Sequence, residues 1–264
     1  CLNVIEYKAD VYRDIKTGEL YHAEFPDGVA DDVNYGSSVR AFLFLLNNDC
    51  CVSIDKCRDF LKNLTDGKLD ISKGMISKLS KEFSEKSEAL RRSAVSEMFL
   101  SPVIHTDCTN ARVNGQRAYV FICAAPDGPA LYYARGAKGH AGVAGTPVED
   151  YQGILIHDHE KTFYKYGSAH QECLAHVLRY LKGSIENEPE RTNKDMHSLL
   201  QEMVHYVNGV ESGEERDSVK IHEYETRYAQ VLKTASSEYE DIPCSDYYRE
   251  GFNLAARMNV YRDA

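Results

Sequence analysis

Hydrophobic and polar residues alternate near the start of the chain, in LNVIEYKADVY and again in GELYHAEF. Alternation with a period of two is typical of β-strands, and the intervening Lys16, Thr17 and Gly18 favour a tight turn. We therefore expect residues 1–35 to hold a small antiparallel pair of strands.

The hydrophobic spacing then becomes helical over residues 36–100. We expect a helix over SVRAFLFLLNN, a second over SIDKCRDFLKNL with Ser53 as its N-cap, and a long third helix from ISKGM to SEMF that Pro102 closes. Three such helices resemble a helix-turn-helix arrangement, which would put Lys78, Lys81 and Lys86 on an exposed face in contact with DNA. Short helices with outward lysines are more often plain solvated helices, so both interpretations stay open.

Residues 101–182 predict an α/β section with a mixed sheet. Strands are expected at residues 103–106, 117–125, 130–134 and 153–159, separated by turns that include the Asn114-Gly115 pair. A short helix is expected from Pro147, and an amphipathic helix over AHQECLAHVLRYLKG. Residues 183–264 show further helical patterns, NKDMHSLLQEMVHYVNGV and KIHEYETRYAQVLKTAS, and predict a helical section.

Composition indicates a globular protein. At 264 residues with 43% hydrophobic content, the chain can bury a sizeable core and fill two or three compact units. No hydrophobic stretch approaches the ~18 residues that cross a bilayer, and no signal peptide is visible, so we expect a cytoplasmic protein. The chain begins at Cys1 and not at a methionine, which favours a fragment or a processed product.

The charge is uneven along the chain. A formal net charge of −10 argues at face value against nucleic acid as a partner. However, residues 183–264 hold 9 basic against 17 acidic residues, whereas residues 50–92 hold 10 basic against 7 acidic. The net negative charge therefore lies in the C-terminal third, and the rest of the chain could still bind DNA.

The eight cysteines are spread widely and form no CxxC pair, which favours reduced thiols and excludes a zinc ribbon within the chain. Cys50, Cys51 and Cys57 stand among hydrophobic residues, so we expect them to fill a core.

Two hydrophobic strands, VIHTD and ILIHD, are each predicted to end on an aspartate, Asp107 and Asp158. If these strands are neighbours, their ends lie ~5 Å apart, and a hard cation such as Mg²⁺ or Mn²⁺ would relieve the repulsion between the carboxylates. Such a site can run phosphoryl transfer with two metal ions. Either aspartate alone is more often a turn or cap residue.

Four segments carry a resemblance to a known family: HTDCTNARVNGQRAYVF, GTPVEDYQGILIHDHEKTFYKYG, HQECLAHVLRYLKGSIENEPER and REGFNLAARM. Together they resemble the catalytic region of bacterial DDE transposases of the insertion-sequence sixty-six family. The resemblance implies a ribonuclease H-like core whose three acids bind two Mg²⁺ (or Mn²⁺) ions. It also implies a nucleoid-associated homo-oligomer that cuts and rejoins double-stranded DNA at transposon ends and target.

By the resemblance, Asp107 is the first catalytic acid and Asp158 the second. Cys173 and His176 match a Cys-x-x-His pair that could shape the site, with His170 nearby, although a buried thiol and a hydrogen-bonded histidine would explain them equally well. His105, His157 and His159 could support the acids, but such histidines are more often merely solvated. The family's third acid, a glutamate, is expected beyond Ala264, so we expect the triad to be incomplete in this chain. Glu172, Glu202 and Glu250 are present, but the resemblance assigns none of them the role of third acid.

Two other functions stay open beside a truncated transposase. A metal-dependent nuclease or phosphoesterase would nick DNA without joining it. A catalytically inactive DNA-binding remnant would bind DNA whether or not Asp107 and Asp158 are intact.

Overall fold

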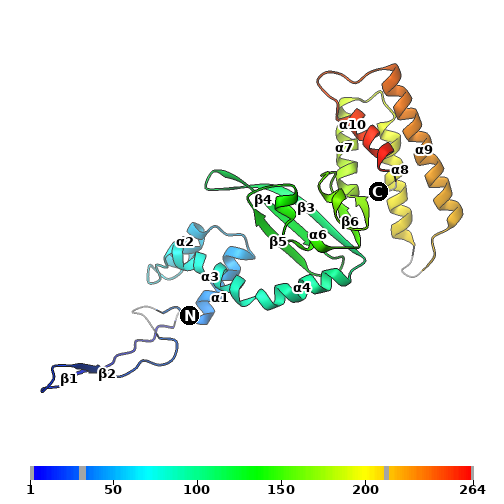
Figure 1. The fold of residues 1–264 in the computed structure, drawn as a ribbon. Coiled ribbons are helices and arrows are strands. Elements are labelled where there is room, and N and C mark those ends of the chain that lie inside the picture. The colour runs from blue at the N-terminus through cyan, green and yellow to red at the C-terminus, as the bar shows by residue number, and fades with distance from the viewer. Residues whose placement is uncertain (1–2, 30–33, 211–213, 263–264) are drawn as a thin grey trace. The chain divides into compact units, whose positions relative to one another are not determined.

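A computed structural model describes residues 3–29, 34–210 and 214–262 (Figure 1). Cys1 and Ala264, on which the expectations of a fragment and of a missing third acid rest, lie outside the described residues. The chain divides into two units, Cys1–Leu90 and Arg91–Ala264. The predicted division into four sections is finer than this and stays a prediction.

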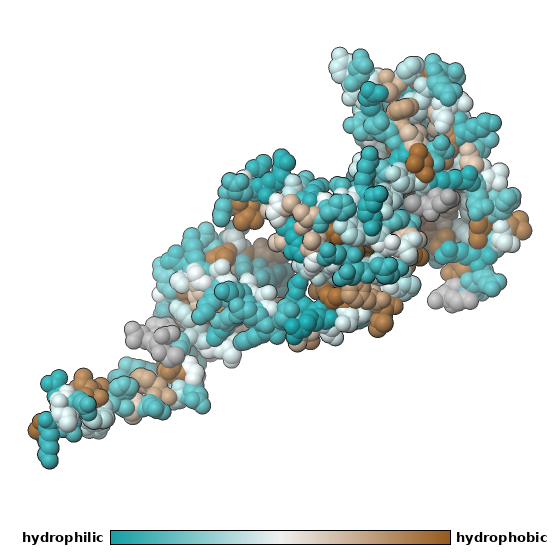
Figure 2. All heavy atoms as spheres, viewed as in Figure 1, coloured by the Kyte–Doolittle hydropathy of each residue, from teal (hydrophilic) through white to brown (hydrophobic). Residues whose placement is uncertain are grey.

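The N-terminal strands are confirmed as an antiparallel pair, β1 (Val11–Arg13) and β2 (Leu20–His22). The Asp14 carboxylate closes their turn, because it accepts hydrogen bonds from the backbone N–H groups of Lys16 at 2.6 Å and Thr17 at 3.0 Å. Every residue of both strands is exposed, and Figure 2 shows hydrophobic side chains on the surface of this ribbon.

Three helices make the core of the first unit: α1 (Ser37–Asn48), α2 (Ile54–Leu64) and α3 (Lys73–Lys86). Ser53 caps α2 as predicted, since its side chain accepts a hydrogen bond from Lys56 N. The cluster that the helices bury consists of Leu43, Cys57, Leu61, Ile71, Ile76 and Leu79.

Two expectations for this region are wrong. The long third helix is broken at Ser87, after which α4 (Glu88–Leu100) begins. Cys57 is buried in the core, but Cys50 and Cys51 are exposed. The reason is local, because both cysteines follow the end of α1 in a turn where Cys51 has φ of 55°.

The second unit contains a five-stranded mixed sheet in the order β5-β4-β3-β6-β7. Its strands are β3 (Val103–Val113), β4 (Gln116–Ala124), β5 (Ala130–Arg135), β6 (Ile154–His157) and β7 (Ala169–Glu172). β3, β4 and β5 pair antiparallel, and β6 runs parallel to both β3 and β7. The β3–β4 hairpin turns at Asn114 and Gly115, whose φ values of 51° and 76° suit the predicted Asn-Gly turn.

Two strand predictions are corrected here. The first strand does not stop before Asp107 but continues to Val113, because residues 107–113 pair with β4 as far as the hairpin turn. The residues AHQE were expected to open a helix, yet they form β7, whose pairing with β6 supplies their backbone hydrogen bonds. The helix begins only at Leu174.

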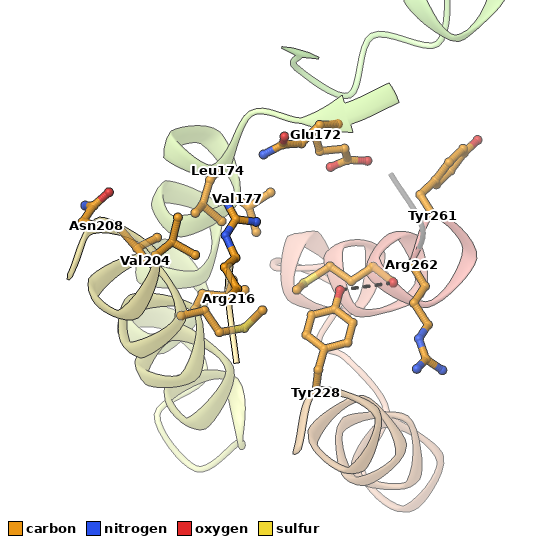
Figure 3. Close-up of a pocket in the computed structure, with 14 residues that line it drawn as sticks. Glu172, Leu174, Val177, Val204, Asn208, Arg216, Tyr228, Tyr261 and Arg262 are labelled. Carbon is orange, nitrogen blue, oxygen red and sulfur yellow. Dashed lines mark hydrogen bonds between the residues drawn. The ribbon is translucent and has the colours of Figure 1, made fainter. Parts of the chain in front are cut away.

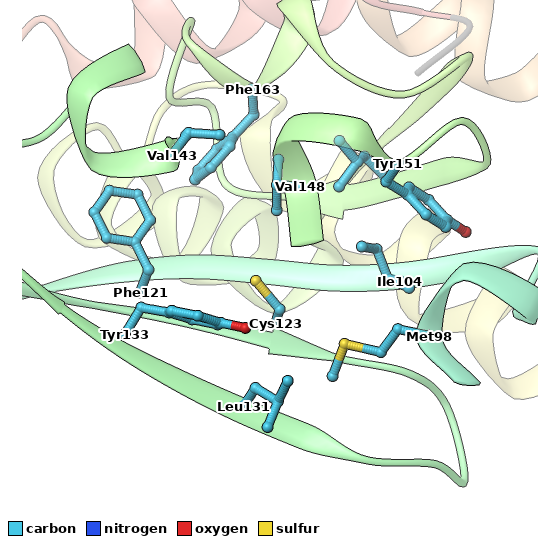
Figure 4. Packing of buried hydrophobic residues seen from close by; sticks show 11 residues of the cluster. Met98, Ile104, Phe121, Cys123, Leu131, Tyr133, Val143, Val148, Tyr151 and Phe163 are labelled. Carbon is cyan, nitrogen blue, oxygen red and sulfur yellow. The ribbon is translucent and has the colours of Figure 1, made fainter. Parts of the chain in front are cut away.

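One face of the sheet packs against α4 and three short helices, α5 (His140–Val143), α6 (Pro147–Asp150) and η1 (Phe163–Lys165). Figure 4 shows Val143, Val148 and Phe163 directed at the sheet residues Phe121 and Cys123. This buried layer fixes β3 and β6 beside each other.

The helical section is confirmed by α7 (Leu174–Asn187), α8 (Asn193–Gly209), α9 (Ser218–Asp241) and α10 (Glu250–Val260). These helices share a core of Val177, Leu181, Met196, Leu200, Leu232, Leu254 and Met258. Among the described residues, no helix has the length and hydrophobicity that crossing a membrane requires.

Candidate metal centre

Asp107 lies in β3, and Asp158 directly follows the end of the neighbouring parallel strand β6. The ladder between β3 and β6 matches Val103 with Ile154 and His105 with Ile156. Continuing this register by two residues puts Asp107 opposite Asp158, where parallel strands lie ~4.8 Å apart. Matched residues of adjacent strands project from the same face of a sheet, so this register, if continued one position past the end of β6, would direct both side chains to one side.

Each carboxylate is oriented by a local hydrogen bond. Asp107 Oδ1 accepts from the backbone N–H of Cys108 at 2.7 Å, and Asp158 Oδ1 accepts from Glu160 N at 3.1 Å. Both aspartates are half-buried. The local bonds therefore hold one oxygen of each carboxylate and leave the other oxygen for a further partner.

A small pocket beside the aspartates contains groups that the sequence did not single out. Cys108, Lys138 and Glu160 line it together with Phe163. Burial raises the pKa of the Cys108 thiol, the Lys138 ammonium lowers it, and the carboxylates of Asp107, Asp158 and Glu160 raise it. All four charged groups therefore lie close enough to act on one sulfur.

The donor set fits a hard divalent cation in part. Carboxylate oxygens are the ligands that Mg²⁺ and Mn²⁺ prefer, and Mg²⁺ is commonly held by one or two carboxylates while it keeps several waters. Across the described ranges, no group of three or more His, Cys, Asp or Glu side chains is arranged to hold a metal ion. Asp107 and Asp158 thus offer two ligands, and no third carboxylate joins them in this part of the chain.

Histidines near Asp158 are packed rather than solvated. His157 is fully buried, and its Nε2 lies 3.2 Å from His170 Nδ1. Burial lowers the pKa of both imidazoles. His105 is exposed, in agreement with the expectation that a histidine at such a position is solvated.

Glu172 ends β7 and is enclosed by three partners. His159 Nδ1 lies 2.6 Å from Glu172 Oε1, and Tyr164 donates its hydroxyl hydrogen to the same oxygen at 2.7 Å. Arg257 Nε, from α10, lies 3.0 Å from Oε2 as an ion pair without aligned hydrogen-bond geometry. Glu172 therefore ties the loop that follows Asp158 to the last helix and has no oxygen without a partner.

Cys173 and His176 occupy the start of α7. Cys173 is its N-cap residue, and its carbonyl accepts the N–H of His176 at 2.9 Å. His176 Nδ1 is buried and finds no hydrogen-bond partner among the described residues. No ion pair or hydrogen bond within residues 34–210 and 214–262 joins either residue to Asp107 or Asp158, so their role in shaping the site stays a prediction.

The predicted DNA-contacting lysines lie on α3 in the first unit. Lys78 pairs with Glu82 at 3.7 Å and Lys81 with Glu85 at 3.9 Å, while Lys86 is exposed in the last turn. Contact of these lysines with DNA stays a prediction.

A wider pocket lies between β7 and the helices α7 to α10 (Figure 3). Its walls are mainly hydrophobic, with Glu172, Arg216 and Arg262 among the polar residues that line it. Glu172 is already paired, so this pocket does not extend the acidic site.

The strand order, the parallel β3–β6 pair and the helices that pack on the sheet define a mixed α/β class compatible with a ribonuclease H-like fold. A family model described as "Transposase IS66 family" matches residues 33–255. The chain therefore belongs to the IS66 family of transposases, which confirms the resemblance and suggests an enzyme that cuts and joins DNA. Searches of curated proteins and of solved structures found no match to the chain.

Proposed function

We propose that this chain carries the first two metal ligands of a DDE transposase centre that cleaves and joins DNA strands. Asp107 and Asp158 are the proposed ligands of Mg²⁺ or Mn²⁺. The observation that supports the proposal is the parallel β3–β6 register, whose continuation past β6 brings Asp107 opposite Asp158, in a chain that belongs to a transposase family.

The side chains around the site would prepare it for a phosphodiester. The β3 ladder fixes Asp107, and the bond from Glu160 N fixes Asp158, so each carboxylate keeps one oxygen directed to a ligand. A bound divalent cation would supply activation of water or a 3′ hydroxyl and stabilise the leaving oxygen. Lys138 brings positive charge to the same region, where a DNA phosphate would need it.

Mn²⁺ binding to the full chain tests the proposal directly. Titration followed by electron paramagnetic resonance should show bound Mn²⁺ that Asp107→Asn and Asp158→Asn each weaken strongly. Asp127→Asn, a change of the same kind in the β4–β5 turn, should leave binding unchanged. Retention of Mn²⁺ affinity in both Asp107→Asn and Asp158→Asn would overturn the metal centre.

Strand-transfer assays separate the alternatives. A transposase gives joined products, whereas a plain nuclease gives nicks only. A catalytically inactive remnant binds DNA but gives neither product. Assembly into a homo-oligomer on DNA stays a prediction from the family.

A further inference from the structure

The β3–β4 hairpin places two arginines directly opposite each other. Arg112 pairs with Arg117 in the ladder, and both side chains are exposed. Like charges at opposed positions of antiparallel strands are destabilising. Within the described part of the chain neither arginine forms an ion pair, and Arg112 Nη1 reaches only the Gly115 carbonyl at 3.4 Å. The hairpin thus keeps positive charge that the protein does not neutralise.

The sequence around the hairpin is basic in an acidic protein. Residues 108–126 contain no aspartate or glutamate, although the whole chain has a net charge of −10. Over residues 108–139, four basic residues stand against the single acid Asp127. This local excess is confined to β3, β4, β5 and the turn that follows.

A third cation lies on the same face of the sheet. Lys138 Nζ lies 5.6 Å from the centroid of the Tyr119 ring, and Tyr119 pairs with Asn110. Asn110 and Arg112 share one face of β3 because side chains alternate along a strand. Lys138 also lines the small pocket that contains Cys108 and Glu160. A basic strip therefore runs from the hairpin tip to this pocket, on the face of β3 opposite to the one from which Asp107 projects.

The dimensions of the strip suit a duplex. Arg112 follows Cys108, which lines the small pocket, by four positions, and this corresponds to ~14 Å along an extended strand. Several phosphates of a DNA backbone fall within this length. By contrast, Lys78 and Lys81 on α3 each have a glutamate partner one turn away.

We propose that Arg112, Arg117 and Lys138 form a binding strip for the phosphate backbone of double-stranded DNA on one face of the β3–β4 hairpin. Double-stranded DNA as the occupant rests on the proposed function, whereas the strip itself rests on the hairpin geometry and charge. Phosphate contacts would stabilise the opposed arginines and give sequence-independent affinity.

The test is the salt dependence of binding between the full chain and a fluorescently labelled duplex of random sequence, followed by anisotropy. Each lost phosphate contact lowers the slope of log K against log salt concentration by about 0.9. We expect the double variant R112Q/R117Q to lose about 1.8 from that slope and Lys138→Gln about 0.9. The matched control K78Q/K81Q removes the same charge from α3 and should leave the slope unchanged.

Two further measurements separate charge loss from misfolding and from failure of the metal centre. R112Q/R117Q should melt no lower than the unaltered chain, since a repulsive pair is removed. D107N/D158N should lose Mn²⁺ binding yet keep duplex affinity. Three results would each overturn the proposed strip. The slope could stay unchanged in R112Q/R117Q, or it could fall equally in K78Q/K81Q. The unaltered chain could also show no salt-dependent binding to the duplex. Competition by poly-glutamate as effective as that by duplex would assign the strip to acidic proteins instead.

Discussion

Arg257 on α10 lies 3.0 Å from Glu172 at the end of β7, and the two side chains are only 13% and 8% exposed. The pair joins residues 85 positions apart and links the helical section to the loop that carries Asp158. Tyr261 stacks on Tyr164 at 4.6 Å between ring centroids, which adds an aromatic contact to the same junction. The position of the last helix and the position of the Asp158 loop are therefore coupled.

Removal of Arg257 should destabilise the protein strongly. Arg257→Met leaves the Glu172 carboxylate buried without its counter-charge, a change that typically costs about 3–5 kcal/mol in the free energy of unfolding. Burial and the hydrogen bond to Glu172 raise the pKa of Tyr164, so its hydroxyl stays neutral and donates a hydrogen bond to Glu172 without replacing the charge of Arg257. Urea unfolding followed by circular dichroism measures the loss.

Arg227→Met is the matched control. Arg227 Nη1 lies 2.7 Å from Glu202, but these side chains are 40% and 49% exposed. Solvent screening limits such pairs to about 1 kcal/mol or less. Equal losses in the two variants would show that burial does not set the strength of the Glu172 contact.

Local patterns of the sequence were sufficient for several parts of the fold. Ser53 caps a helix through its own side chain, and the Asn114-Gly115 turn needs only two residues with positive φ. The strand before Asp158 was predicted for the same reason, from the hydrophobic residues of ILIH, although it was expected over residues 153–159 and ends at His157. These features depend on neighbours in the chain, which a single sequence displays.

Features that depend on distant partners could not be predicted. Asp107 lies within β3 because residues beyond it pair with β4, although their side chains are polar. The residues AHQE form a strand only because β6 lies beside them. The partners of Glu172 come from the loop after β6 and from α10, and no spacing in the sequence relates Glu172 to Arg257.

Asp70 should make the stability of the first unit depend on pH in the acidic range. Its carboxylate accepts hydrogen bonds from Arg58 Nε at 2.8 Å and Lys62 Nζ at 3.1 Å, and these contacts lower its pKa to about 2. Because the folded pKa is below the unfolded value of ~3.9, the contribution is present above pH ~4 and is lost as the pH falls toward 2.

Asp70→Asn should therefore lower the melting temperature at pH 7 and have progressively less effect as the pH is reduced. Thermal melts followed by circular dichroism between pH 7 and pH 3 measure this difference. A difference between Asp70→Asn and the unaltered chain that is constant over this range would contradict the ion-pair explanation.

Thiol reactivity should follow burial. Cys123 is completely buried in the sheet core, and burial raises its pKa to about 11, whereas Cys50 and Cys51 are exposed. The thiolate is the reactive form, so Cys123 should resist a disulfide reagent at pH 8 that modifies Cys50 and Cys51. Mass-spectrometric mapping before and after denaturation checks this order, and rapid labelling of Cys123 in the native protein would contradict the packing of the sheet.

A side chain at position 142 should lower the stability of the protein. A Cβ atom at this position of α5 would lie 2.5 Å from the Ala137 carbonyl oxygen and 2.5 Å from the Phe121 ring, so Gly142→Ala requires a shift of the backbone or of a core side chain. Overpacking of this kind costs about 1–3 kcal/mol. Gly136→Ala is the control, since nothing lies within 4 Å of its Cβ, and a surface change without such a feature alters stability by about 0.5 kcal/mol at most. Urea unfolding of the two variants compares them directly, and equal stabilities would show that α5 does not pack closely on Phe121.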